Sequence, residues 1–260
     1  MKNPEDYNVR AVERALLILN CFDDQHSERG ISEISQAVGL HKATAHRLVT
    51  TLVNYNFLER VEDGQKYRLG MALADLGMKV VRQTDLREEA LPFMKKLNQQ
   101  FDETCDLSIF DNWQVYYIEV LPSSHALNIA ATVGQGLPAY CTASGKVFLA
   151  NLNTDELEDY LEKPLKPLTE KTITSPAELK RQLDEVRQDG FATDNEETEI
   201  GIRAISVPIF GRKNNVVAAI GIPSPTSRLS QEGLQNMTAA LKDAAEQISA
   251  RLGWKKQRVD

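Results

Sequence analysis

Residues 31–52 read ISEISQAVGLHKATAHRLVTTL, and this stretch decides the fold of the first part of the chain. It predicts two short helices that meet at Gly39, because glycine adopts the left-handed conformation that a tight turn between helices requires. Ser32 is the expected N-cap of the first helix. Apolar residues recur at helical spacing, and these are expected to point inward: Ile34, Ala37, Val38, Leu40, Ala45, Leu48, Val49 and Leu52. The pattern predicts a helix-turn-helix motif, whose second helix lies in the major groove of DNA.

The outward face of the second helix is suited to contact a nucleic acid. Its expected DNA-binding residues are Lys42, Ala43, Thr44, His46, Arg47 and Thr50. Residues 34–58 contain no Asp or Glu, although the chain is acidic overall. Because a carboxylate on this face would repel the phosphate backbone, the absence of acids favours DNA binding. A helix pair from another kind of small α-helical domain is the alternative at this point.

A β-hairpin is predicted directly after the helix pair. Residues 56–61 and 66–69 form two short runs on either side of Asp63-Gly64, a dipeptide typical of tight β-turns. A hairpin in this position is a wing, and its basic residues Lys66 and Arg68 can reach the flanking DNA backbone or the minor groove. A helix-turn-helix followed by a wing is a more specific signal for DNA binding than either part alone.

The charge of the chain is divided unevenly. The 260 residues carry a net charge of −7. Residues 1–83 contain 11 Lys and Arg against 11 Asp and Glu, whereas residues 84–260 contain 19 against 26. Only the first part is therefore expected to meet DNA, and its modest basicity indicates that affinity depends on dimerisation.

The cysteines and the apolar segments indicate the cellular compartment of the protein. Cys21, Cys105 and Cys141 are odd in number and widely spaced, so the sequence predicts neither a disulfide framework nor a metal site. The longest apolar run, residues 216–222, falls short of the roughly 20 residues that span a bilayer. The first ten residues contain acids and no apolar core, unlike a signal peptide. These observations predict a cytoplasmic protein without membrane contact.

The remaining chain predicts one helix before the motif and an α+β domain after it. Residues 10–22 are expected to form a helix whose buried stripe consists of Val12, Ala15, Leu16, Leu19 and Phe22. A polar loop over 23–29 follows, and residues 70–84 form a helix that either links two domains or opens the second one. Further helices are predicted over 87–101, 142–152, 176–188 and 231–252. Strands are predicted over 104–110, 114–120, 127–132, 203–210 and 216–222, and a loop is predicted over 134–136. Antiparallel hairpins mixed with helices favour an α+β fold.

Two stretches of the second part are candidates for ligand binding. Residues 141–146, CTASGK, open a helix with small residues, and the unpaired amides of such a helix end attract a carboxylate. The alternative is an ordinary helix start with Thr142 as its N-cap. Residues 190–197, GFATDNEE, which are followed by Gly201-Ile202-Arg203, either line a polar pocket or form a solvated loop.

An enzymatic role has little support in the sequence. Cys141 near a helix start could be an activated thiol, and the acids of residues 194–197 could transfer protons. No His lies near either group in sequence, however, and no nucleophile–base pair can be named. We therefore expect no catalytic residues, no metal and no cofactor.

The combination of motifs resembles the IclR-type family of bacterial transcriptional regulators over residues 9–253. The marks of the resemblance are RAVERALLIL, the helix-turn-helix stretch, the wing segment YRLG, LPAYCTASGKVFLA, GFATDNEETEIGIRAISVPIF and IPSPTSRLS. The resemblance implies an N-terminal winged helix-turn-helix domain over residues 1–69, a linker helix over 70–84, and a GAF-like α+β domain for effector binding and oligomerisation over 85–260. It also implies a homodimer or homotetramer that binds a palindromic operator and a small organic or sugar acid.

The resemblance further implies a set of effector-contacting residues. These are Ile129, Leu137, Thr142, Ala143, Ser144, Asp194, Ile202, Ala204, Gly221 and Pro223. Many members of the family have Cys at the position of Ala204 and hydroxyl residues at those of Gly221 and Pro223. This wall of the site is therefore expected to be wider or less polar here, and the ligand to differ in its tail.

The sequence thus predicts a DNA-binding regulator, more specifically a repressor of a catabolic operon, that a small carboxylate controls. One alternative is a constitutive DNA-binding protein whose second domain only oligomerises. A more remote alternative is an enzyme with an attached DNA-binding module.

Overall fold

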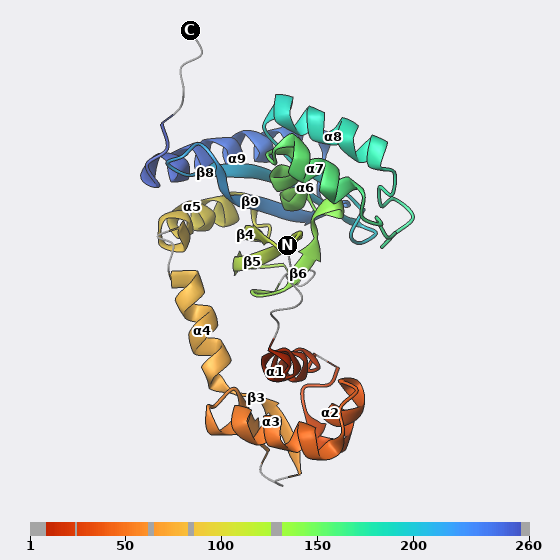
Figure 1. The fold of residues 1–260 in the computed structure, drawn as a ribbon. Helices are drawn as coiled ribbons and strands as arrows, with labels where there is room; N and C mark the ends of the chain where they lie inside the picture. The colour runs from red at the N-terminus through yellow and green to blue at the C-terminus, as the bar shows by residue number, and fades with distance from the viewer. Residues whose placement is uncertain (1–8, 24, 62–64, 83–85, 126–131, 256–260) are drawn as a thin grey trace. The chain divides into compact units, whose positions relative to one another are not determined.

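The computed structural model describes residues 9–23, 25–61, 65–82, 86–125 and 132–255, with the side chains of 78–82 left out. The chain divides into two compact units, Met1–Gln83 and Thr84–Asp260. This division lies one residue before the predicted start of the second domain. Each unit has its own hydrophobic core, and Figure 1 shows the elements of both in chain order.

The first unit contains the predicted helix pair and hairpin. Its elements are α1 (Arg10–Asn20), β1 (Arg29–Gly30), α2 (Ile31–Ala37), α3 (Lys42–Asn54), β2 (Leu58–Arg60), β3 (Lys66–Leu69) and α4 (Met71–Arg82). Strands β2 and β3 pair antiparallel, as the wing requires, and the predicted turn at Asp63-Gly64 lies outside the described residues. Strand β1 adds a third strand beside β3, where a loop was predicted.

The start of α2 differs from the prediction. The N-cap position belongs to Gly30, and Ser32 lies exposed within the first turn. The Glu33 carboxylate accepts a hydrogen bond of 2.6 Å from the Gly30 amide. A carboxylate on the first turn also interacts favourably with the positive end of the helix dipole, so the helix begins without a side-chain N-cap.

The predicted buried stripe of the first helix is only partly correct: Phe22 is buried and Leu19 packs against the core, but two other residues of the stripe are exposed. Val12 and Leu16 are 56% and 53% exposed, whereas Ile18 is fully buried. The helix carries apolar side chains on nearly all sides, so spacing alone did not identify the side that packs. The remaining core of the unit follows the prediction more closely, with Ile34 and Val49 buried from the helix pair, although Ala37 is exposed. The complete core consists of Ile18, Phe22, Ile34, Val49, Leu58 and Tyr67.

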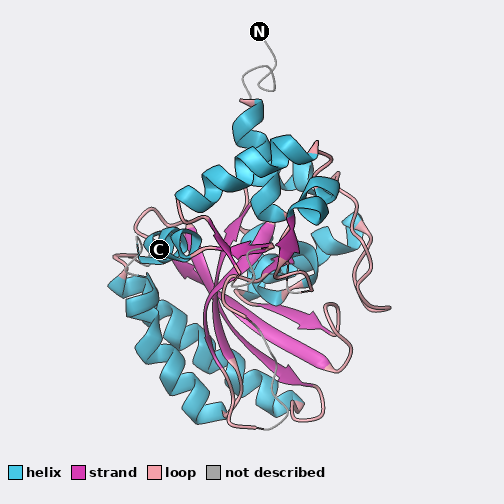
Figure 2. Cartoon of the chain, turned by 90° about the horizontal axis from the view of Figure 1, so that it is seen from below, coloured by secondary structure: helices cyan, strands magenta, loops and turns pink. Residues whose placement is uncertain are grey.

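The second unit is an α+β domain built on one sheet. Its elements are α5 (Leu86–Phe101), β4 (Cys105–Asp111), β5 (Gln114–Leu121), β6 (Gly136–Pro138), the 3-10 turn η2 (Ala139–Cys141), α6 (Ala143–Ala150), α7 (Thr154–Leu161), α8 (Pro176–Asp189), β7 (Ala192–Asn195), β8 (Ile202–Phe210), β9 (Val216–Pro225) and α9 (Gln231–Arg251). The six strands form a curved antiparallel sheet in the order β6-β5-β4-β9-β8-β7 (Figure 2).

Four of these elements, the 3-10 turn η2 among them, were not predicted. Strands β6 and β7 were expected to be loops, and no helix was predicted where α7 lies. Both are edge strands of only three and four residues, too short to show the apolar alternation by which a strand is recognised. The predicted strand over 127–132 falls on residues of which all but the last lie outside the described part of the chain.

The sheet separates two hydrophobic cores. Helices α5 and α9 cover one face, while α6, α7 and α8 cover the other. Successive side chains of a strand point to opposite faces. Leu107 and Ile220 therefore pack against α5 and α9, whereas their chain neighbours Asp106 and Gly221 face the side of α6.

Candidate functional site

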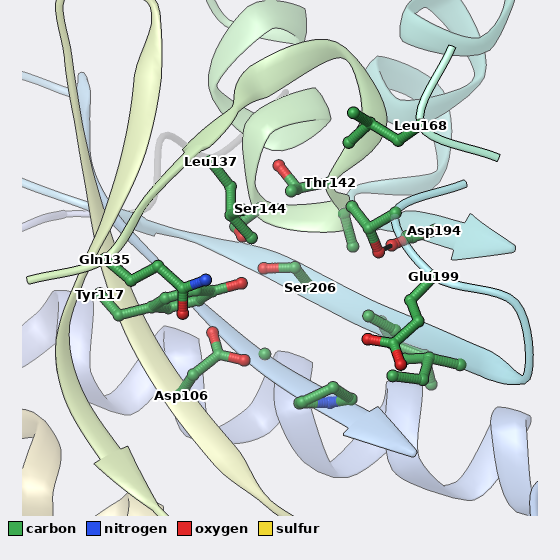
Figure 3. Close-up of a pocket in the computed structure, with 17 residues that line it drawn as sticks. Asp106, Tyr117, Gln135, Leu137, Thr142, Ser144, Leu168, Asp194, Glu199 and Ser206 are labelled. Atoms are coloured by element: carbon green, nitrogen blue, oxygen red, sulfur yellow. Dashed lines mark hydrogen bonds between the residues drawn. The ribbon is translucent and has the colours of Figure 1, made fainter. Parts of the chain in front are cut away.

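The second unit contains a cavity of about 170 Å³ between the sheet and the start of α6 (Figure 3). Nine of the ten predicted effector residues line it: Leu137, Thr142, Ala143, Ser144, Asp194, Ile202, Ala204, Gly221 and Pro223. Ile129 lies outside the described residues. The structure thus brings segments that are far apart in sequence to one cavity, which suits a small ligand.

The first turn of α6 lines one end of the cavity. Thr142 is the N-cap of the helix, as the alternative of an ordinary helix start expected, and its Oγ1 accepts a hydrogen bond of 3.0 Å from the Gly145 amide. The amides of Ala143 and Ser144 have no hydrogen-bond partner within the described part of the chain. These two residues line the cavity. Unpaired amides at the positive end of a helix dipole attract a negatively charged group.

Close packing fixes the position of α6. A Cβ atom at Gly145 would lie 2.1 Å from the carbonyl oxygen of Ala139, so only glycine allows this approach. The side chain of Lys146 is buried, with its Nζ 3.1 Å from the Thr193 carbonyl oxygen and 2.5 Å from Glu197 Oε1. This buried pair ties α6 to β7 and the loop that follows it.

Asp194, at the end of β7, shapes the loop beside the cavity. Its Oδ1 accepts a hydrogen bond of 2.7 Å from the Glu197 amide, and its Oδ2 accepts one of 2.5 Å from the Thr198 hydroxyl. Burial raises the pKa of Asp194 above its usual range. Since each carboxylate oxygen has two lone pairs, Asp194 can hold the loop and still accept a hydrogen bond from a ligand.

Several polar residues of the cavity were missed from the sequence: Asp106, Tyr117, Gln135, Thr198, Glu199 and Ser206. A signal for Asp106 did exist, because an acid between Cys105 and Leu107 interrupts an apolar strand and buried acids need a reason. Burial raises the pKa of Asp106 to about 7. Burial together with the nearby Asp106 carboxyl group also raises the pKa of Tyr117, so its hydroxyl stays protonated.

The wall around Gly221 is more polar than the sequence suggested. Gly221 is paired with Asp106 across strands β4 and β9. A Cβ atom at Gly221 would lie 3.1 Å from Asp106 Oδ1, so the missing side chain leaves room for the Asp106 carboxyl group. The Asp106 carboxyl group therefore makes this part of the wall polar.

In the first unit, α3 presents most of the predicted DNA-binding residues on its surface. Lys42, Ala43, His46 and Arg47 are exposed. Two further predicted residues, Thr44 and Thr50, are half-buried. The Thr50 hydroxyl donates to the His46 carbonyl oxygen at 2.8 Å, which is a bond within the helix. The exposed face is basic, as contact with phosphates requires.

The wing carries its two basic residues on β3. Lys66 and Arg68 are exposed, whereas Tyr67 between them is buried in the core. Arg68 forms an ion pair with Glu59 on the paired strand, with 2.5 Å between Nε and Oε1. The charge of Arg68 is therefore balanced locally, a feature that the sequence pattern did not indicate.

The three cysteines lack the features of activated nucleophiles. All three cysteines are free thiols, and burial raises the pKa of Cys141 to about 12. A thiol with so high a pKa is not an activated nucleophile at neutral pH. In the described ranges, no three His, Cys, Asp or Glu side chains are grouped so that they could hold a metal ion. Nor does any helix there combine the length and apolar character needed to cross a membrane.

Comparisons with known proteins decide the family. Residues 11–62 match the IclR helix-turn-helix domain, and residues 78–250 match the family described as bacterial transcriptional regulator IclR C-terminal. The chain belongs to the IclR family of bacterial transcriptional regulators. This IclR-family regulator is 37% identical over 254 residues to the HTH-type transcriptional regulator KdgR of Escherichia coli K12. That alignment covers 97% of this chain and 95% of the relative.

Solved structures of IclR-family proteins share the fold of the whole chain. A transcriptional regulator from Rhodococcus sp. RHA1 matches with a TM-score of 0.83 and 34% identity, covering 95% of this chain and 99% of that one. An IclR homologue from Microbacterium hydrocarbonoxydans, complexed with 4-hydroxybenzoate, matches with a TM-score of 0.82 and 29% identity over 94% and 99% of the two chains. The predicted architecture of a winged helix-turn-helix and an α+β IclR domain is thereby confirmed. The named relatives are transcriptional regulators rather than enzymes.

Proposed function

We propose that this IclR-family regulator acts in the cytoplasm as a repressor of a catabolic operon. It binds a palindromic operator as a homodimer or a dimer of dimers, and a small organic or sugar acid in the cavity of the second unit changes its affinity for that operator. The observation that carries the proposal is the exposed basic side of α3, in a stretch from residue 34 to residue 58 that contains no acid.

The DNA contact divides into base-reading and backbone-positioning parts. The exposed residues His46 and Arg47 lie on the side of α3 that would enter the major groove, while Lys42 at its start and Lys66 on the wing would contact phosphates. The first part of the chain has no net positive charge, so one copy attracts DNA only weakly by electrostatics. Two copies on half-sites roughly 34 Å apart, or a multiple of that spacing, supply the missing affinity.

The effector contact begins at the start of α6. The amides of Ala143 and Ser144 hold the carboxylate of the ligand, Asp194 accepts a further hydrogen bond, and Leu137 with Ile202 forms the apolar part of the wall. The complex of the Microbacterium relative with 4-hydroxybenzoate, which is itself a carboxylate, supports this class of ligand. The ligand changes operator affinity to the extent that it binds one state of the protein better than the other.

Selection of DNA from a random pool tests the proposal without knowledge of the operator. The full chain should enrich an inverted repeat, and fluorescence anisotropy should show that binding to this repeat weakens steeply with salt. Arg47→Ala should lose at least about 1 kcal/mol of binding free energy and relax the sequence preference at one position of each half-site. Lys180→Ala removes an exposed charge from α8 in the second unit and serves as the matched control.

The result that would contradict the proposed reading of DNA is equal binding by Arg47→Ala and the unaltered chain. Enrichment of a sequence without an inverted repeat would contradict the symmetric dimer. A panel of small carboxylates that changes neither the melting temperature nor the operator affinity would favour a constitutive DNA-binding protein instead.

A further inference from the structure

The Asp106 carboxyl group has no evident structural task. The residue is 4% exposed and lines the cavity. Its Oδ1 atom is buried without a hydrogen-bond partner within the described part of the chain. A buried polar atom that lacks a partner destabilises a fold, so its presence calls for a reason. In Figure 3 the carboxyl group points from β4 into the cavity, beside Tyr117.

The groups around Asp106 are suited to a neutral polar ligand group. Tyr117 approaches from β5 with a hydroxyl that stays protonated, and Ser206 approaches from β8. The Ser206 hydroxyl donates to the Ile220 carbonyl oxygen at 3.1 Å, which leaves its lone pairs free to accept. The raised pKa of Asp106 means that both its protonated and its ionised forms are accessible near neutral pH. A ligand hydroxyl can donate to either form and can also accept from the protonated one.

The charge of the cavity lining further restricts the class of ligand that the cavity can bind. It includes the acids Asp106, Asp194 and Glu199, and no Lys or Arg is among the described residues that form it. The carboxylate of a ligand therefore has its favourable position at the amides of α6. The part of the ligand that lies beside Asp106 and Ser206 faces hydrogen-bond acceptors, and a hydrocarbon group at that place would leave these acceptors buried without donors.

We infer that Asp106 is a specificity-determining ligand contact. In the space that Gly221 leaves open, its carboxyl group hydrogen-bonds a hydroxyl group of the bound acid, so the cavity selects a hydroxylated small acid over an unsubstituted acid of the same length. This inference rests on the proposed function, because it concerns the effector of the same cavity. It assigns a residue on β4, outside the set that the family resemblance implied.

Matched pairs of acids test the inference by calorimetric titration of the full chain. The pairs are glycerate and propanoate, threonate and butanoate, xylonate and pentanoate, and gluconate and hexanoate. At least one hydroxylated acid should bind about tenfold more tightly than its unsubstituted partner, the effect of one well-placed hydrogen bond. Asp106→Leu should bring that ratio close to one, whereas Asp106→Asn, which keeps an accepting oxygen, should retain most of it.

Gly221→Ala provides a second route that leaves Asp106 in place. The added Cβ would lie 3.1 Å from Asp106 Oδ1 and 3.1 Å from the Ile205 carbonyl oxygen, so the carboxyl group must shift. The preference for the hydroxylated acid should fall in this variant also. Asp111→Asn, at the exposed end of the same strand, is the control and should keep the preference of the unaltered chain.

The outcomes separate the two proposals. If the unsubstituted acids bind as tightly as the hydroxylated ones and still change operator affinity, the assignment of Asp106 is overturned while the regulatory function stands. An unchanged preference in both Asp106→Leu and Gly221→Ala, each folded by circular dichroism, overturns the assignment as well. If no acid of either series binds, the assignment falls together with the choice of small acids as effectors, while DNA binding is judged by its own assay.

Discussion

Replacing Asp106 with Asn should make the stability of the second unit rise with pH relative to the unaltered chain. Burial raises the pKa of Asp106 from 3.8 to about 7. Between these two values the folded chain keeps a proton that the unfolded chain has lost. The unfolded state is therefore favoured increasingly as pH rises from about 4 to about 7, and above pH 7 the loss of stability is complete. An Asn side chain does not titrate, so the variant escapes this loss.

The size of the effect follows from the shift in pKa. At about 1.4 kcal/mol for each unit, the difference between 3.8 and about 7 corresponds to a loss of about 4 kcal/mol at pH 8. At pH 5 the same relation gives a loss of roughly 2 kcal/mol, because that pH lies above the unfolded pKa of 3.8 but still well below the folded pKa of about 7. The stability difference between the variant and the unaltered chain should therefore grow by roughly 2–3 kcal/mol from pH 5 to pH 8.

Tryptophan fluorescence isolates the relevant unit. The chain has two Trp residues, Trp113 and Trp254, and both belong to the second unit. Urea titrations followed by their emission at pH 5, 6, 7 and 8 give the free energy of unfolding for each chain. Asp159→Asn, which replaces an exposed acid on α7, controls for the general effect of removing a carboxylate.

The reasoning would be refuted if the unfolding free energies of the variant and of the unaltered chain changed in parallel with pH. If Asp106→Asn differs from the unaltered chain by the same free energy at all four pH values, Asp106 titrates alike in the folded and unfolded states, and its side chain is not buried in a low-dielectric wall. The offset between the curves depends on how the amide hydrogen-bonds, but their divergence with pH depends only on the pKa of Asp106.

Further substitutions test the packing that holds the site and the DNA-binding unit. Lys146→Met should lower the unfolding free energy by about 3–5 kcal/mol in urea titration, because Glu197 then stays buried without its partner, and the added change Glu197→Gln should restore part of it. Gly145→Ala should abolish carboxylate binding in calorimetry and lower the melting temperature, since the new Cβ overlaps the Ala139 carbonyl group. Ile34→Ala should cost about 2–5 kcal/mol in the first unit, seen as an earlier loss of helical circular dichroism with unchanged tryptophan emission.

The sequence predicted the first unit well where local chemistry decides the structure. The turn at Gly39 and the apolar spacing of Ile34 and Val49 depend on contacts within a few residues, and both appear in the structure. The side of α1 that packs was not predictable in the same way. That helix has more apolar residues than its contact with α3 can bury, so the choice of Ile18 over Leu16 depends on tertiary packing.

The sequence predicted only those parts of the candidate pocket that carry a recognisable motif. The start of α6 and the segment around Asp194 carry recognisable patterns, and the structure brings both to the same cavity. Asp106 and Tyr117 could not be placed there from the sequence, because the cavity forms only when β4 and β5 pair with each other and β4 pairs with β9. The pairing of Asp106 with Gly221 joins residues that are distant in the chain, and no local pattern predicts the register of such strands.

In the pocket, the start of α6 attracts an anion, whereas the acids of the sheet repel it. Lys146, the lysine of the TASGK segment, forms a buried ion pair with Glu197 and does not line the cavity. The attraction for a carboxylate therefore comes from the amides of α6. An anion at that position is repelled by every ionised acid of the sheet. A protonated Asp106 removes part of this repulsion and, in the same state, donates a hydrogen bond. The free-energy cost of burying an acid on β4 is thus offset when a hydroxylated anion is bound.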